Sequence, residues 1–92
     1  MLKNFRQFYR YPSNSFCLLE SDGRIVKAYF VDYSQMGCLL RIDKLVSVKK
    51  QIALIYPNDK SEFVKMAGLS VHFQEKQGLY YLGVKFIALI SR

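Results

Sequence analysis

Residues 14–32, NSFCLLESDGRIVKAYFVD, contain the clearest structural signal in this sequence. Two apolar runs, 14–20 and 25–32, flank a Ser-Asp-Gly-Arg segment. Asp-Gly between apolar runs is a strong hairpin signal, because both residues tolerate positive φ. The second run is also rich in β-branched and aromatic residues, which favour strands. The sequence therefore predicts an antiparallel β-hairpin over these residues.

Strand signals continue after this hairpin to the end of the chain. We expect further strands over 38–42, 52–56, 62–74 and 79–89, separated by turn-like segments such as 34–37, 57–59 and 75–78. Gly68 lies near the middle of the long fifth segment and predicts a bulge or bend there. In the last segment, the period of two places Leu82 and Val84 on one face and Gly83 and Lys85 on the other.

Six short strands without a helical pattern predict an all-β fold, namely a six-stranded antiparallel β-barrel. Closure of the sheet also removes the free edges that a chain of 92 residues could not otherwise protect. This length suits one domain. We expect residues 14–92 to form the barrel. Residues 1–13 are polar, aromatic and basic, with Pro12 near their end, and we expect them to form a flexible N-terminal arm.

The charge and hydropathy of the chain limit its partners and its location. Fourteen Lys and Arg against seven Asp and Glu give a net charge of +7, which favours an anionic partner such as a nucleotide, a nucleic acid or an acidic membrane. No apolar run approaches the roughly 18 residues that cross a bilayer, so we expect no membrane insertion. The N-terminus contains no signal-peptide pattern, and a cytoplasmic location is therefore expected.

The residues that usually perform catalysis or bind metals are scarce here. His72 is the only histidine and lies alone in an apolar stretch, without a nucleophile beside it. Cys17 and Cys38 form no C-x-x-C pair, and a single histidine does not complete a zinc site with them. We therefore expect a binding protein rather than an enzyme, with no catalytic residues, no metal site and no cofactor.

Two short patterns remain that combine charged and turn-forming residues. Residues 6–10, RQFYR, form an R-x-x-x-R pattern in the predicted arm. Residues 32–37, DYSQMG, form a D-x-S-x-x-G pattern where the second predicted strand ends. Either pattern alone is weak, because solvated arginines are common and because Asp, Ser and Gly are typical turn residues.

Taken together, in this order and spacing, the two patterns resemble those of the PilZ domain family. Residues 66–71, MAGLSV, resemble that family's later glycine-containing strand, and residues 81–86, YLGVKF, resemble its closing strand. The resemblance covers nearly the whole chain. It implies a six-stranded β-barrel that binds bis-(3′-5′)-cyclic dimeric GMP (cyclic di-GMP), a bacterial second messenger. The ligand-binding residues that it implies are Arg6, Arg10, Asp32, Ser34 and Gly37.

The chemistry of this ligand fits the five residues. The arginine side chains of Arg6 and Arg10 match phosphate oxygens and the O6 and N7 acceptors of guanine. The carboxylate of Asp32 can accept hydrogen bonds from guanine N1–H and N2–H₂. Ser34 supplies a hydroxyl that points to the same side as Asp32 if the strand continues through both. Gly37 permits a close approach of the backbone, and its amide can donate a hydrogen bond.

The resulting hypothesis is a receptor or adaptor whose N-terminal arm changes conformation on binding cyclic di-GMP and signals to a protein partner. The sequence does not identify that partner. One alternative is a small basic barrel that binds single-stranded nucleic acid through stacked aromatics. Asp32 argues against it, since a carboxylate disfavours a groove that tracks phosphates. Another alternative is a PilZ-like adaptor that binds no ligand.

Overall fold

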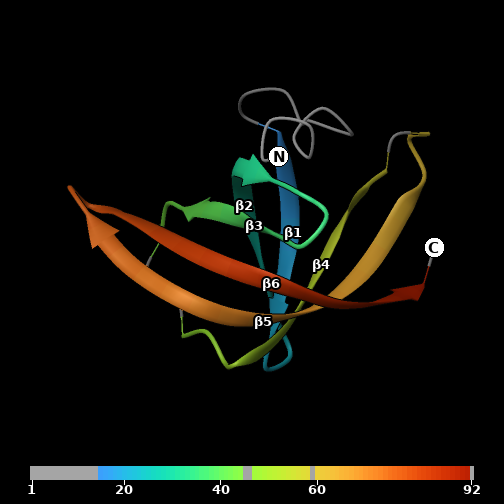
Figure 1. Ribbon diagram of the computed structural model, residues 1–92. Helices are drawn as coiled ribbons and strands as arrows, with labels where there is room; N and C mark the ends of the chain where they lie inside the picture. The colour runs from blue at the N-terminus through green and yellow to red at the C-terminus, as the bar shows by residue number, and fades with distance from the viewer. Residues whose placement is uncertain (1–14, 45–46, 59, 92) are drawn as a thin grey trace.

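A computed structural model describes residues 15–44, 47–58 and 60–91, which form six antiparallel strands closed into a barrel (Figure 1). The strands are β1 (Phe16–Ser21), β2 (Arg24–Tyr33), β3 (Gly37–Ile42), β4 (Gln51–Pro57), β5 (Phe63–Lys76) and β6 (Leu79–Ser91). The predicted all-β, six-stranded antiparallel barrel is thereby confirmed. The predicted arm, residues 1–13, lies outside the described residues.

The order of strands around the barrel is β1-β2-β3-β6-β5-β4. β1, β2 and β3 pair side by side in chain order. The other edge of β3 pairs with β6 rather than with β4. The barrel closes where β1 meets β4 through three residue pairs, from Leu18↔Ile55 to Glu20↔Ala53. The described residues contain no helix that is long and apolar enough to span a membrane.

Two tight turns each join a pair of neighbouring strands into a hairpin, as the sequence predicts. Asp22 and Gly23 between β1 and β2 have φ values of 55° and 78°. Gln77 and Gly78 between β5 and β6 have φ values of 54° and 82°. Consecutive positive φ angles match the right-handed twist of the flanking strands, which explains why two-residue turns suffice. The second turn is shorter than the expected 75–78 loop, because Lys76 still pairs with Leu79.

The long hairpin of β5 and β6 curves around the barrel (Figure 1). Its pairing register shifts at three places, between Lys65 and Met66, between Ala67 and Gly68, and between Ser70 and His72. Each shift is a bulge that bends the strands and increases their twist. The bend predicted at Gly68 is therefore observed. A β-carbon on Gly68 would come within 2.7 Å of Val84 Cγ1, so the absence of a side chain allows the two strands to pack closely.

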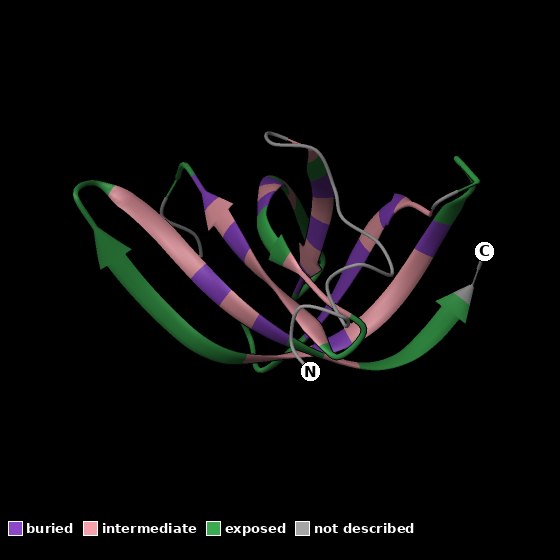
Figure 2. Cartoon of the chain, turned by 45° about the horizontal axis from the view of Figure 1, so that its top comes forward, coloured by how far each residue is buried: buried purple, intermediate pink, exposed green. Residues whose placement is uncertain are grey.

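Buried residues alternate with less buried ones along much of the strands (Figure 2), as expected when every second side chain points into the barrel. The buried set includes Cys17, Leu19, Ala28, Phe30, Leu40, Ile42, Leu54, Tyr56, Leu82 and Val84. On β6 the predicted alternation is confirmed, since Leu82 and Val84 are buried whereas Lys85 is exposed.

Candidate functional site

The D-x-S-x-x-G pattern forms the connection between β2 and β3 at one end of the barrel. The backbone N–H of Ser34 donates to the Gly37 carbonyl oxygen at 2.8 Å. The Ser34 hydroxyl donates to the same oxygen at 3.2 Å and accepts from the backbone N–H of Met36 at 3.3 Å. Ser34 therefore closes this turn with both its backbone and its side chain, as serine commonly does in turns.

Asp32 lies just before this turn with its carboxylate exposed. The β2–β3 register shifts between Phe30 and Asp32, so a bulge precedes the carboxylate. One carboxylate oxygen accepts a hydrogen bond from the backbone N–H of Tyr33 at 2.9 Å. The other oxygen has no partner among the residues that the structure describes. Asp32 is thus held in place on one side and able to accept a ligand donor on the other.

The strand does not continue through Ser34, because β2 ends at Tyr33. The period-of-two argument for the relative direction of Asp32 and Ser34 therefore does not apply, and the two side chains bond to different backbone groups. The Ser34 hydroxyl is engaged inside the turn and retains capacity to accept one further hydrogen bond. The hydrogen bonds of Ser34 are therefore made to Gly37 and Met36, within the turn that follows Asp32.

Gly37 begins β3 and lies against the backbone of β6. It pairs with Lys85, and the next amide on β6, Phe86 N–H, donates to the Met36 carbonyl oxygen at 2.8 Å. A β-carbon on Gly37 would overlap the carbonyl oxygen of Val84. Any other residue would therefore push the turn away from β6, and glycine is required by this close approach.

An aromatic cluster includes Tyr33, the residue between Asp32 and Ser34. It consists of Phe30, Tyr33, Tyr56 and Phe86, whose ring centroids lie 5.5–6.0 Å apart in the contacting pairs. The Tyr33 and Tyr56 hydroxyls are 3.4 Å apart, close enough for one to donate to the other. Burial, and then the hydrogen bond with Tyr33, raises the pKa of Tyr56 above its usual range. Phe30 and Tyr56 belong to the buried core, and the partly buried Tyr33 and Phe86 pack against it.

Sequence reasoning missed this cluster. Tyr33 occupies an unspecified position of the D-x-S-x-x-G pattern, and the bulge before Asp32 interrupts the alternation of buried and exposed residues in β2. A period of two counted from Phe30 would have placed Tyr33 outside. Its partner Tyr56 lies 23 residues away in sequence, so no local pattern could connect the two.

The structure thus brings together three of the five predicted site residues, Asp32, Ser34 and Gly37. Arg6 and Arg10 lie outside the described residues. The first described residue, Ser15, accepts a hydrogen bond from Phe30 N–H at 2.9 Å, and Phe16 pairs with Tyr29. β1 therefore begins beside the end of β2 at which Asp32 lies.

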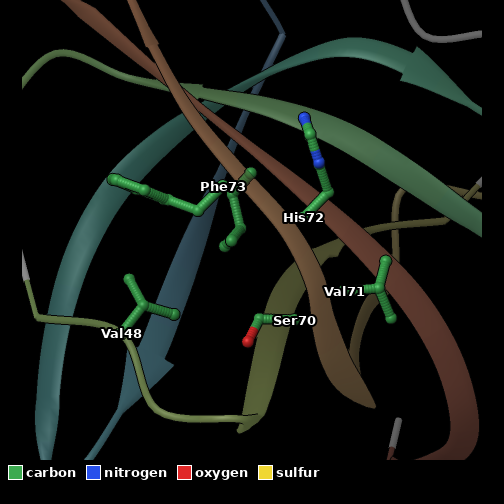
Figure 3. Close-up of a pocket in the computed structure, with 6 residues that line it drawn as sticks. Val48, Ser70, Val71, His72 and Phe73 are labelled. Carbon is green, nitrogen blue, oxygen red and sulfur yellow. The ribbon is translucent and has the colours of Figure 1, made fainter.

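A pocket lies between the β5–β6 hairpin and the connection before β4. It is an open pocket of about 390 Å³ lined by Val48, Ser70, Val71, His72, Phe73 and Leu82 (Figure 3). The Ser70 hydroxyl donates to the Lys49 carbonyl oxygen at 3.0 Å, and His72 Nε2 lies 3.3 Å from Gln74 Oε1. Ser70 and His72 therefore have separate partners and do not form a nucleophile–base pair.

Cys17 is buried in the core, and the partly buried Cys38 packs against it. Burial raises the pKa of the Cys17 thiol to about 12, and burial also raises the pKa of Cys38. Thiols in such surroundings stay protonated and are poor nucleophiles and metal ligands. Within the described ranges, no group of three or more His, Cys, Asp or Glu side chains is arranged to hold a metal ion.

Comparison with known proteins agrees with this geometry. The PilZ domain family matches residues 4–92, a range that includes both short patterns and all six strands. No curated protein and no solved structure matches the chain. The family match extends over nearly the full sequence, and the barrel and the D-x-S-x-x-G turn are both present. This chain belongs to the PilZ domain family.

Proposed function

We propose that this chain is a receptor and adaptor module for cyclic di-GMP. PilZ domains are a family of modules that bind cyclic di-GMP, act through partner proteins and are generally not enzymes. The observation that carries the proposal is the exposed Asp32 carboxylate at a turn fixed by Ser34 and Gly37, with one oxygen held by Tyr33 N–H. An acceptor held in this way suits the adjacent N1–H and N2–H₂ donors of a guanine edge.

The two arginines of the R-x-x-x-R pattern supply the complementary donors. Arg6 and Arg10 precede a strand that starts beside the end of β2, so a short span of chain separates them from the Asp32 turn. Guanidinium groups bind phosphates bidentately and can also bind the O6 and N7 acceptors of guanine. The proposed site therefore combines donors from the arm with an acceptor from the barrel.

The proposed signalling mechanism depends on the site having one part in the arm and one part on the barrel. We propose that ligand binding draws the arm onto the barrel and that the altered surface then binds a protein partner in the bacterial cytoplasm. Ordering a segment of this length costs conformational free energy, which the charge-assisted contacts to the ligand offset. The partner contacts neither Asp32 nor the arginines in this scheme, because the ligand occupies them.

The test is a calorimetric titration of the full chain with cyclic di-GMP, with cyclic di-AMP and a short single-stranded oligonucleotide as comparisons at one fixed salt concentration. We expect cyclic di-GMP to bind well above the other two, because adenine offers no counterpart of the guanine N1–H and N2–H₂ donors. Competition by an equal concentration of cyclic di-AMP would contradict guanine recognition. Preference for the oligonucleotide would favour a nucleic-acid-binding barrel, and binding of none would favour an adaptor without ligand.

A further inference from the structure

Lys85 is an exposed cation next to the Asp32–Gly37 turn. It lies opposite Gly37 in the β3–β6 ladder, and β6 is fixed against the turn by the 2.8 Å bond from Phe86 N–H to the Met36 carbonyl oxygen. Its neighbour Val84 is buried, so the alternation along β6 directs Lys85 to the outer surface of the barrel. The position of the Lys85 backbone relative to the turn is therefore well defined.

The charge of Lys85 is not used within the barrel. Four other basic residues have partners: Arg41 with Asp43 at 2.8 Å, Lys65 with Glu20 at 2.9 Å, Lys49 with Asp22 at 4.0 Å, and Lys27 with the Phe16 ring at 4.4 Å. Lys85 has neither an ion pair nor an aromatic partner among the residues that the structure describes. It is the exposed, unpaired cation that directly adjoins the D-x-S-x-x-G turn across a strand pair.

Two residues without charge, Leu39 and Gly83, separate Asp32 from Lys85 across the sheet, and His72 on β5 borders Gly83. Asp32 pairs with Leu39, and Leu39 pairs with Gly83, so the three residues form a row across β2, β3 and β6. Gly83 contributes no side chain to this row. Strands lie about 4.8 Å apart and a two-residue step spans about 7 Å, which puts Lys85 roughly 12 Å from Asp32. A ligand that lies over Leu39 and Gly83 can contact both.

We propose that Lys85 binds a phosphate of the cyclic dinucleotide whose guanine is held by Asp32. The inference rests on the proposed function and adds a phosphate-binding residue on β6 to the Asp32–Gly37 turn. Residues 32–37 include an acceptor for guanine but no basic side chain, so the turn cannot itself neutralise a phosphate. A lysine ammonium binds phosphate as a compact point charge, which suits the exposed edge of such a site.

The test compares cyclic di-GMP binding by wild type, Lys85→Ala, Lys85→Gln and Lys85→Arg at several salt concentrations. We expect Lys85→Ala and Lys85→Gln to weaken binding about tenfold, the effect of losing one charge-assisted hydrogen bond, and to reduce its salt dependence. Lys85→Arg should restore most of the affinity. Lys76→Ala is the matched control, because Lys76 is exposed at the far end of the β5–β6 hairpin and carries the same charge.

The outcomes separate this inference from the function on which it rests. If the Lys85 variants bind like Lys76→Ala while Arg10→Ala binds weakly, the assignment of Lys85 is wrong and the receptor function stands. If wild type binds no cyclic di-GMP, both fail. Thermal melting checks the fold of each variant, and the two neutral substitutions guard against loss of one variant through misfolding.

Discussion

Gly37 lies directly opposite Lys85, and a β-carbon on Gly37 would overlap the carbonyl oxygen of Val84 on the same strand. The glycine that ends the D-x-S-x-x-G pattern therefore permits the turn to rest on β6. This contact joins the turn that holds Asp32 to the strand that presents Lys85. The close packing of Gly37 against β6 requires glycine at this position even when no ligand is bound.

Replacing Gly37 should therefore destabilise the barrel itself. We expect Gly37→Ala to lower the free energy of unfolding by about 1–3 kcal/mol, the usual cost of forcing an atom into a closely packed site. Urea denaturation measures this change. Gly83→Ala is the matched control and should cost less, because its β-carbon would make a tight contact with His72 Cβ at 3.2 Å rather than overlap a backbone atom. Unchanged stability of Gly37→Ala together with lost ligand binding would contradict the packing explanation.

Replacing Asp32 separates guanine recognition from general binding of polyanions. Asp32→Ala should weaken cyclic di-GMP binding by about 1–3 kcal/mol, because guanine donors lose their acceptor in a partly desolvated site. A site that merely attracts phosphates should instead bind more tightly once a negative charge is removed. Parallel titrations with cyclic di-GMP and a short oligonucleotide at one salt concentration show whether Asp32→Ala lowers or raises the affinity for each ligand.

Two further variants control that measurement. Glu75→Ala removes the same charge from an exposed position on the β5–β6 hairpin and should leave affinity unchanged. Asp32→Asn retains an oxygen that can accept from Tyr33 N–H, so it tests the carboxylate charge while the local turn geometry is kept. Equal or tighter binding by a folded Asp32→Ala variant would refute the guanine assignment.

Replacing Arg10 should affect binding far more than folding. We expect Arg10→Ala to reduce cyclic di-GMP affinity by about 1.5–3 kcal/mol, the range for a hydrogen bond to a charged group. The melting temperature should hardly change, because Arg10 precedes the first strand of the barrel. Arg24→Ala, in the turn region at the opposite end of β2, is the matched control. A large fall in melting temperature for Arg10→Ala would show that the arm is structural.

The burial of Cys17 predicts a loss of stability at alkaline pH. Its pKa is raised from 9.0 to about 12, so above pH 9 the unfolded chain releases this thiol proton while the folded chain keeps it. The free energy of unfolding should then fall with a slope that approaches about 1.4 kcal/mol per pH unit for this group. Urea denaturation at pH 8, 9 and 10 measures the slope, and Cys17→Ala should show a shallower one. Identical slopes would mean that the thiol ionises equally in both states.

The sequence by itself determined the strands, the turns and the fold class of this protein. Asp22-Gly23 and Gln77-Gly78 form turns because these residues themselves adopt positive φ, which is a local property of the chain. The alternation in β6 likewise reflects a local period of two. The D-x-S-x-x-G pattern likewise indicated where Asp32, Ser34 and Gly37 would meet, since all three lie within six residues.

Only the tertiary structure decided how distant strands meet. The placement of β6 beside β3, the closure of β1 on β4, and the contact of Tyr33 with Tyr56 each join segments that are far apart in the chain. These pairings depend on packing of the whole core, where many side chains must fit at once, and no local pattern encodes that fit. The position of Lys85 beside Gly37 belongs to this second class, because it follows from strand order and register rather than from any motif.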